Sequence, residues 1–336
     1  MGDKGELNLL IDMIGDDSAG KWFAVVNIFA ASRKAGYRWK TTKQLLEKEG
    51  VKYEYECTGS VGNAAYLTME ACRKGFRRIL AVGGDGTIHD VFNAIMSFVY
   101  SSGLDASDFT LGVIPMGSGN DWIKTLGIST KLSSAVSSIA AGRTSKHDIV
   151  RLSVLDSSKL PEESAISVSY MVNVGGIGID ANVCEIVNHK KKRGEGGRIL
   201  YVKALVEAIR KRKASPVRVI ADSRIVFRGD FLSIAFGVGK YSGGGMRQTP
   251  EAVVDDGLVD LTVVPELPLG RIAAKIYKLF NGSFLTIPEL VYTKSKSILV
   301  CPESEVCPLI EVDGEVVGRA PLKVDVLSGF INVIVP

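Results

Sequence analysis

The segment GGDGT at 83–87 constrains this chain most, because it joins a predicted buried strand to a predicted helix. The apolar run from Ile79 to Val82 ends at these glycines, and a helical pattern of apolar residues begins at Ile88. A helix that starts directly after a strand leaves its first backbone N–H groups without partners, and the helix dipole adds positive potential there. Glycines also let a ligand approach the backbone closely. The segment therefore predicts a binding site for phosphate or another anion.

Asp85 is the unusual residue of this turn, because a carboxylate beside bound phosphate repels it. The carboxylate is tolerated if a divalent cation bridges it to the phosphate, or if it positions or deprotonates a nucleophile. Both roles indicate phosphoryl-transfer chemistry. The alternative is that these five residues form only a structural turn between a strand and a helix, and the rest of the chain has to decide.

The patterns along the 336 residues predict two domains. In the first half, apolar strand patterns alternate with helical patterns, which is typical of an α/β domain with a parallel sheet. A helical pattern that ends at Gly142 closes this half. Beyond it, many short apolar runs predict a β-sandwich, and helical patterns over 199–211 and 271–280 predict helices packed against it. We therefore expect one domain over 1–145 and another over 146–336, and whether the tail from Leu322 returns to the first domain is left open.

Composition and charge limit the cellular compartment and the partners that we expect for the protein. We expect neither a membrane-spanning helix nor a secretory signal, and five cysteines without a CxxC pair favour a reducing cytoplasm. The three histidines lack zinc-ligand spacing. Basic residues gather at 190–193 and 210–213, either as solvated chain ends or as a surface for anionic lipid headgroups. Aromatic residues do not interleave with them, so nucleic acid is not an expected partner.

Five motifs follow one another in order along the chain. They are GGDGTIHDVFN at 83–93, PMGSGNDW at 115–122, NVGGIGIDANV at 173–183, GKYSGGGMRQTPEAVVDDGLVDL at 239–261 and EVDGE at 311–315. Together they resemble the diacylglycerol kinase catalytic-domain family, in particular the soluble bacterial lipid kinases, with ceramide and sphingosine kinases as more distant relatives. Each motif alone is a weak signal, but their order across two domains makes the resemblance specific.

The resemblance implies a nucleotide-binding first domain similar to that of phosphofructokinases and NAD kinases, a β-sandwich that holds the lipid, and ATP between them. Hydroxyls and backbone amides suit a transfer that depends on positioning and electrostatics. Asn120 and Asp121 are expected to brace the second glycine loop and to cap the short helix after it. The implied ATP contacts are Thr58, Gly83, Gly84, Asp85, Gly86, Thr87, Ile88, His89 and Ser118.

Two carboxylates are candidate catalytic residues by resemblance. Asp313 in EVDGE matches the general base of the bacterial relatives, whereas some relatives assign that role to the position of Asp85. We favour Asp313 as the base, with Asp85 organising magnesium and phosphates. Local sequence alone would make Asp313 part of an ordinary Asp-Gly hairpin turn, so its catalytic role rests on the resemblance.

A further Mg²⁺ site, structural or regulatory, is implied at Asp256. The main-chain carbonyls of Val253 and Leu258 would complete this site, which is distinct from the Mg²⁺ that accompanies ATP. Oxygen ligands alone suit a hard cation. The alternative is that these residues form another Asp-Gly turn without a metal.

The loop after the first strand departs from the family pattern. Relatives carry N-P-x-[AS]-G-x-G there, whereas Asn27 is followed here by IFAASR at 28–33. Without the proline and the glycines this loop is expected to follow another path, with Arg33 as a candidate phosphate contact. Nucleotide affinity or preference is therefore expected to differ from that of the relatives.

The predicted function is transfer of the γ-phosphoryl group of ATP, with Mg²⁺, to a lipid hydroxyl, diacylglycerol being the first choice. The enzyme is expected to be cytoplasmic and peripheral to the inner face of the membrane, where its lipid substrate lies. A sphingoid base, ceramide or another alcohol is the alternative acceptor, and a catalytically silent nucleotide or lipid sensor is the alternative class. The oligomeric state is left open, a homodimer included.

Overall fold

The computed structural model describes residues 20–30, 35–59, 63–156, 165–191, 198–211 and 215–336. The chain forms two compact units, unit 1 (Met1–His147 with Phe330–Pro336) and unit 2 (Asp148–Gly329). It passes between them twice, along strand β5 (Thr144–Leu155) and along strand β15 (Leu322–Ile334). The boundary expected after residue 145 falls within β5.

Unit 1 is built on a parallel sheet in the order β4-β3-β1-β2. Every residue of β1 is buried, as expected for a strand of a parallel sheet that is covered on both faces. The end of β15 adds to this sheet beside β4, where Asn332 lies opposite Thr110. The strands are β1 (Trp22–Val26), β2 (Tyr53–Cys57), β3 (Arg78–Gly83) and β4 (Thr110–Pro115).

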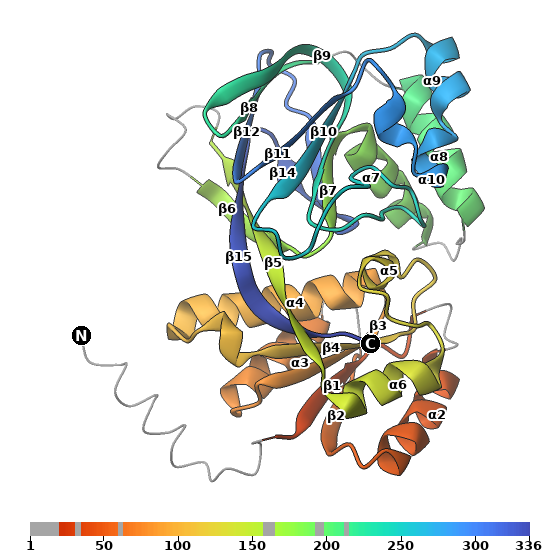
Figure 1. The fold of residues 1–336 in the computed structure, drawn as a ribbon, viewed down its shortest axis with the longest axis vertical. Coiled ribbons are helices and arrows are strands. Elements are labelled where there is room, and N and C mark those ends of the chain that lie inside the picture. The colour runs from red at the N-terminus through yellow and green to blue at the C-terminus, as the bar shows by residue number, and fades with distance from the viewer. Residues whose placement is uncertain (1–19, 31–34, 60–62, 157–164, 192–197, 212–214) are drawn as a thin grey trace. The chain divides into compact units, whose positions relative to one another are not determined.

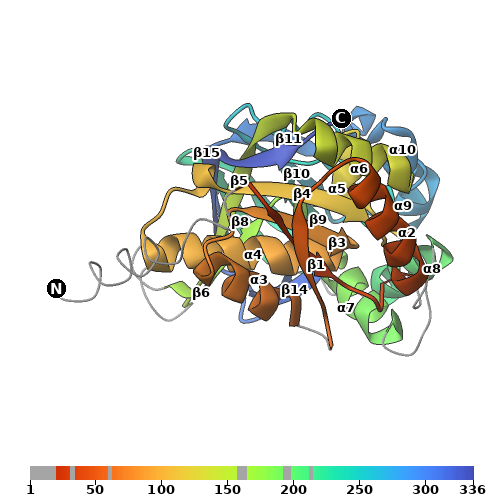
Figure 2. The ribbon, with the colours of Figure 1, turned by 90° about the horizontal axis from the view of Figure 1, so that it is seen from below.

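Helices cover both faces of this sheet (Figure 2). Helices α2 and α6 pack together on one face, and α3 and α4 pack together on the other. α4 ends at Gly103, whose left-handed φ of 72° lets its N–H donate to the Val99 carbonyl. This confirms the predicted α/β fold with a parallel sheet. The helices are α2 (Ala35–Lys48), α3 (Asn63–Arg73), α4 (Asp85–Ser102), the short α5 (Asp121–Thr125) and α6 (Leu132–Ala141), and Ala106–Asp108 form a 3₁₀ turn.

Unit 2 is a β-sandwich (Figure 1), and its two sheets share the long strand β9 (Arg224–Gly237). In the first half of β9, Gly229 pairs with Val217 of β8, and in the second half Phe231 pairs with Pro265 of β10. Valine, isoleucine and leucine side chains fill the core. The other strands are β6 (Ala165–Met171), β7 (Val174–Gly178), β8 (Pro216–Ala221), β10 (Val259–Pro265), β11 (Val291–Ser295), β12 (Ser297–Pro302), β13 (Leu309–Val312) and β14 (Glu315–Arg319).

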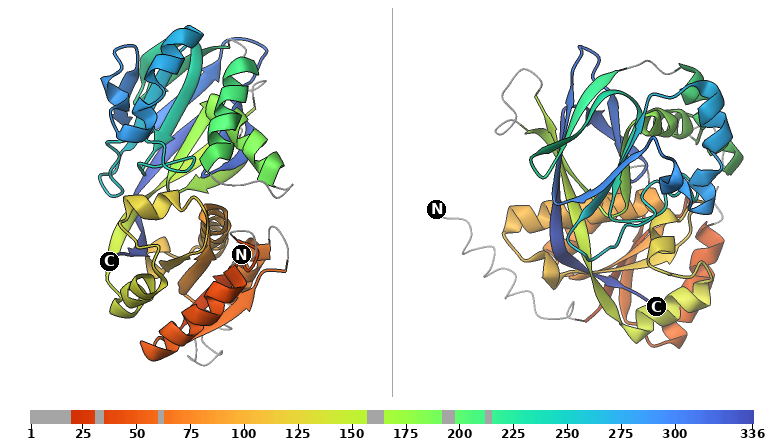
Figure 3. Two further views of the ribbon diagram at one scale, coloured as in Figure 1. Left: turned by 90° about the vertical axis from the view of Figure 1, so that its right-hand side faces the viewer. Right: turned by 45° about the horizontal axis from the view of Figure 1, so that its top comes forward.

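Helices of unit 2 pack against β9 and β10 and share a second apolar core with them (Figure 3). The predicted β-sandwich with added helices is thus confirmed. No helix in the described part of the chain is long and apolar enough to cross a membrane. These helices are α7 (Ile179–Lys191), α8 (Arg198–Lys211), α9 (Leu269–Lys275) and α10 (Lys278–Asn281), and Phe284–Thr286 form a 3₁₀ turn.

Candidate active site

The carboxyl ends of the parallel strands in unit 1 gather most of the residues predicted to bind ATP. Asn27 follows β1 and donates its N–H to the Val82 carbonyl at 2.9 Å, and Thr58 follows β2 and donates to the Val26 carbonyl at 2.9 Å. Gly83 ends the neighbouring strand β3. Open α/β sheets bind ligands at this edge, so the predicted residues lie where a ligand is expected.

The GGDGT turn leads directly into α4. Gly84 is the N-cap in an extended conformation, and no side chain caps the helix there. The first helical hydrogen bond is donated by Ile88 to the Gly84 carbonyl at 3.1 Å, so the amides of 85–87 precede it and are suited to an anion. Ile88 itself is buried and its amide is already used. Of the predicted ATP contacts, Ile88 therefore offers neither its side chain nor its N–H.

The two glycine loops of unit 1 touch each other through their backbones. A Cβ atom on Gly84 would lie 2.9 Å from the Cα of Gly117, and one on Gly117 would lie 2.5 Å from the Cα of Gly84. A Cβ atom on Gly83 would collide with the Thr87 side chain. Glycine is therefore required here for the close approach of the two loops rather than for an unusual φ.

Asp85 connects these loops through a side-chain cap. Its Oδ1 accepts hydrogen bonds from the N–H groups of Asp121 at 2.8 Å and Trp122 at 3.3 Å, which begin α5. The expectation that Asn120 caps this helix is wrong, because its Nδ2 instead donates to the Gly117 carbonyl at 2.8 Å and braces the loop. Burial, and then the charge of Asp121, raise the pKa of Asp85, although the backbone amides of Trp122, Asp121 and Asn120 oppose the shift.

The other predicted ATP contacts differ in their exposure. Thr58 is 3% exposed, and Thr87 is also buried, with its Oγ1 accepting from Asn27 Nδ2 at 3.0 Å. Gly86 and Ser118 are exposed to solvent. The hydroxyls of Thr58 and Thr87 thus support the turn from within, whereas Gly86 and Ser118 lie at its surface.

His89 and the altered loop complete this part of the site. His89 is half-buried on the first turns of α4, beside Asn93. Asn27 Oδ1 accepts from the Phe29 N–H at 3.0 Å, so a side-chain turn opens the loop where relatives have a proline. Arg33, the candidate phosphate contact of this loop, lies outside the described residues.

In unit 2, Asp313 occupies the turn between β13 and β14. Its φ is +50°, and its own N–H donates to the Val174 carbonyl at 3.0 Å. The carboxylate accepts from the N–H of Asn173 at 3.1 Å through Oδ1 and from that of Val172 at 3.2 Å through Oδ2. Backbone amides thus orient Asp313 as an acceptor, and the EVDGE and NVGG motifs meet at this carboxylate.

Asn173 brings a third motif to the same place. Its Nδ2 donates to the Tyr241 carbonyl at 2.8 Å, and its own carbonyl accepts from the N–H groups of Val238 and Gly239, both at 3.0 Å. Within the described chain, its Oδ1 is buried without a hydrogen-bond partner.

Two carboxyl groups beside this turn received no role from the sequence. Glu311 is buried, and its Oε2 accepts from the Gly314 N–H at 3.0 Å. Burial, and then the charge of Asp180, raise the pKa of Glu311 well above its ordinary value. Glu311 pairs in the sheet with Gly176, and the Asp180 side chain lies over Gly176 in the space that a Cβ atom would need. Asp180 and Asp313 therefore flank Glu311.

Asp180 is also the acidic residue of an apolar pocket. Its carboxylate accepts from Ser233 Oγ and Gln248 Nε2, and burial raises its pKa to about 6. All three polar groups line the pocket, as do Arg271 and Lys275, and the remaining wall is mostly aliphatic. The apolar lining includes Ile179, Leu205, Ile209, Leu232, Val264, Leu267, Ile272, Ile276, Leu279, Phe284, Ile287 and Leu290.

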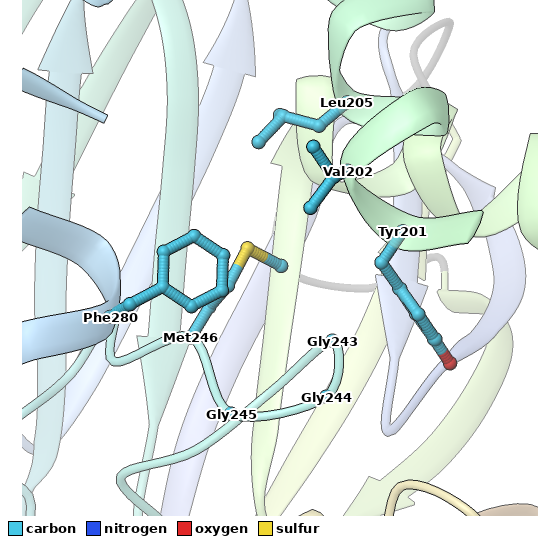
Figure 4. Close-up of a pocket in the computed structure, with 8 residues that line it drawn as sticks. All are labelled: Tyr201, Val202, Leu205, Gly243, Gly244, Gly245, Met246 and Phe280. Atoms are coloured by element: carbon cyan, nitrogen blue, oxygen red, sulfur yellow. The ribbon is translucent and has the colours of Figure 1, made fainter. Parts of the chain in front are cut away.

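A second apolar pocket adjoins α8 and the glycine run of the fourth motif (Figure 4). Tyr201, Val202 and Leu205 project from α8, and Met246 and Phe280 face them across the pocket. Residues 243–245 form one rim, and a Cβ atom on Gly243 would collide with the Met246 side chain. Leu205 lines both pockets, so the two cavities share this side chain.

In the turn predicted to bind the additional Mg²⁺, the carboxylate forms an ion pair with a lysine of strand β11. Asp256 Oδ2 lies 2.8 Å from Lys294 Nζ, and Asp256 Oδ1 accepts from the Leu258 N–H at 3.1 Å. The same ammonium group lies 3.5 Å from the buried Asp260. Both Asp256 oxygens therefore have partners, and Mg²⁺ ligation with Val253 does not fit this arrangement unless Lys294 moves away. Within the described ranges no cluster of three or more His, Cys, Asp or Glu side chains could hold a metal ion.

Comparison with known proteins places this fold, an α/β unit joined to a β-sandwich unit, in a class of kinases. Residues 21–152 match the family model of the diacylglycerol kinase catalytic domain. Residues 173–335 match the model of the YegS C-terminal NAD kinase beta sandwich-like domain. These two matches confirm the resemblance to the diacylglycerol kinase catalytic-domain family stated from the motifs.

The similarity to known proteins extends over most of the chain. Diacylglycerol kinases of Staphylococcus epidermidis and Staphylococcus carnosus are each 27% identical over 291 residues, covering 87% of this chain and 84% and 87% of theirs. A solved diacylglycerol kinase structure from Bacillus anthracis str. Sterne has a TM-score of 0.69 at 21% identity. Another structure from that organism reaches 0.73 at 23% identity. Each covers 94% of this chain and 97% of the solved chain, which supports the fold.

Proposed function

We propose that this protein is a lipid kinase that transfers the γ-phosphoryl group of ATP to the hydroxyl of a lipid, diacylglycerol or a related molecule. One observation carries the acceptor half of the proposal: Asp180 lines an apolar pocket in unit 2, and the buried Glu311 interacts electrostatically with both Asp180 and Asp313. The pocket is therefore close to the Asp313 turn, and its apolar lining suits an acyl chain.

In this proposal Asp313 is the general base. Its two amide partners fix the carboxylate, and it would take the proton of the lipid hydroxyl as that oxygen attacks the γ-phosphorus. Asp85 is better suited to a positioning role, because its Oδ1 is already engaged with the amides that begin α5. It would hold the two glycine loops in the arrangement that receives the phosphates.

ATP would be held by the first-turn amides of α4 and by the exposed loop residues Gly86 and Ser118. A Mg²⁺ ion bound with ATP supplies positive charge to the phosphate oxygens. Because a lipid acceptor lies in a membrane, the reaction would take place at the membrane surface. We therefore also propose that this protein is cytoplasmic and binds the inner face of the membrane.

The test is transfer of labelled phosphate from Mg²⁺-ATP to detergent-dispersed diacylglycerol, ceramide and a sphingoid base. The wild-type protein should label one acceptor class. Asp313→Asn should lower kcat by about 10²- to 10⁴-fold, the usual contribution of a general base, and leave ATP binding nearly unchanged. Equal turnover by Asp313→Asn would contradict the assignment of the base. Demonstrable ATP binding without transfer to any acceptor would favour a sensor instead.

A further inference from the structure

Helix α8 has apolar residues on both its inner and its outer face. The inner face, which includes Leu200, Ala204 and Leu205, is buried in the helical core of unit 2. On the outer face the side chains of Ile199, Val202 and Val206 are 71%, 48% and 42% exposed. Exposed apolar side chains that lie together on one helix face mark a surface for a partner or a membrane. The outer face is therefore expected to meet another apolar environment.

Basic residues share this outer face. Ile199, Lys203, Val206 and Arg210 follow one another at the three- and four-residue spacing of one helix face, and all four are exposed. An apolar ridge with cations beside it is typical of a helix that lies in the interface of an anionic membrane. The combination indicates lipid rather than the interior of another protein.

The ends of α7 and α8 add to the basic character of this region. Glu207 of α8 accepts from Lys190 Nζ of α7 at 3.2 Å and from Lys211 Nζ at 2.7 Å. The two basic segments noted in the sequence therefore meet at Glu207, although 192–193 and 212–213 lie outside the described residues. Because one glutamate is shared by two lysines, this end of the helix pair retains net positive charge.

The outer ridge also continues into an apolar pocket. Val202 belongs to the ridge and lines the pocket of Figure 4. Across the pocket, Phe280 is 43% exposed. A lipid chain could therefore pass from a membrane along the ridge into the pocket while its contacts stay apolar.

We propose that the outer face of α8, formed by Ile199, Val202, Lys203, Val206 and Arg210, is the surface on which the protein docks to an anionic lipid bilayer. The purpose of this docking rests on the proposed function, but the docking itself needs no catalysis. A second copy of this chain is a poorer occupant. If two copies met through this face, Lys203 and Arg210 of one copy would lie near the same cations of the other in a dehydrated interface, where like charges repel.

The test is co-sedimentation of the protein with phosphatidylcholine vesicles that contain or lack phosphatidylglycerol. Wild-type protein should bind the anionic vesicles, and added salt should weaken the binding. The double variant Ile199→Glu/Val206→Glu should bind them about ten-fold less tightly or worse, because it replaces apolar contacts with charges that the membrane repels. Ile166→Glu/Val168→Glu makes the same two changes at positions of β6 that are 69% and 42% exposed, and it should bind like the wild type.

Two further measurements separate this inference from the proposed kinase activity. With a short-chain acceptor dissolved as monomers, the double variant should phosphorylate at the wild-type rate, whereas with vesicle-embedded acceptor it should be slower. If no form phosphorylates any lipid, the proposed function fails and the vesicle binding still decides the docking surface. Equal vesicle binding by wild type and double variant would overturn the docking proposal. So would a wild-type dimer that the double variant dissociates in sedimentation equilibrium.

Discussion

Glu311 shows what a single side chain contributes to the site. It is buried between β7 and β14, its Oε2 accepts the Gly314 N–H, and the charged groups that face it are Asp180 from α7, Asp313 from the turn and Glu315 from β14. Its pKa is raised from an ordinary 4.5, so the folded protein holds this proton more tightly than the unfolded chain does. The contribution of Glu311 to stability is therefore highest below about pH 4.5 and declines as the pH rises toward its folded pKa.

Glu311→Gln should remove this decline, because an amide cannot lose the proton and still accepts the Gly314 N–H. Denaturant unfolding at pH 5 to 8 should show the variant gaining stability relative to wild type, by at most about 1.4 kcal/mol per pH unit. Glu305→Gln makes the same change at an exposed residue of the same unit and should show no such gain. A difference between Glu311→Gln and wild type that does not change with pH would contradict a raised pKa at Glu311.

At the same scale, the sequence singled out two carboxylates, both of them in motifs that contain glycine. Asp85 drew attention because it interrupts a glycine turn, whereas Asp313 was singled out only by the resemblance of EVDGE to the family motif, and both take part in hydrogen bonds that join separate motifs. Glu311 and Asp180 were not assigned a role, since a carboxyl group in a strand or at a helix start gives no local signal of burial. The Asn120 cap was wrong because a distant residue, Asp85, supplies that cap, and sequence spacing cannot show a contact across 36 positions.

At the scale of elements, regular patterns were more informative than short or mixed ones. The strands of unit 1 and helix α8 follow clear periodicity, and the structure places them close to the expected residues. The single helix expected over 271–280 is divided into α9 and α10 by a turn at Ile276 and Tyr277, although Ile272, Ile276 and Leu279 pack against the same apolar core. Helix α7 was not expected, since the glycine-rich strand β7 leads into it at Ile179 without a break in composition.

The contact between the two glycine loops leads to a prediction about how the loops after β3 and β4 pack together. Gly84→Ala should push the loop after β3 away from Gly117, because its Cβ would lie 2.9 Å from the Gly117 Cα. Overpacking of this kind costs about 1–3 kcal/mol, which corresponds to roughly ten-fold or more in ATP affinity if the loops form the phosphate site. Calorimetric titration with Mg²⁺-ATP checks this. Gly36→Ala adds the same methyl group in open space and should bind ATP normally.

At the scale of the whole molecule, one carboxylate links both places where the chain passes between its units. Asp148 is the first residue of unit 2 along β5, and its Oδ1 accepts from the N–H of Gly329, the last residue of unit 2 along β15, at 2.6 Å. Its Oδ2 accepts from the Gly257 N–H at 2.6 Å, and its own N–H donates to the Val254 carbonyl at 2.6 Å. Asp148 is fully buried, so these bonds are shielded from water.

Asp148→Asn should therefore weaken unit 2 where both connections to unit 1 begin. The amide can accept only one of the two N–H groups, and the donor left without a partner costs about 2–3 kcal/mol. All three tryptophans, Trp22, Trp39 and Trp122, lie in unit 1, so their fluorescence reports that unit alone, whereas circular dichroism reports both. Urea unfolding of the variant should show the dichroism signal falling at lower urea than the fluorescence. As a control, Asp230→Asn changes an exposed residue of the same unit and should leave both transitions in place. An unchanged dichroism transition in Asp148→Asn would mean that the buried carboxylate does not hold β5 and β15 together where they enter unit 2.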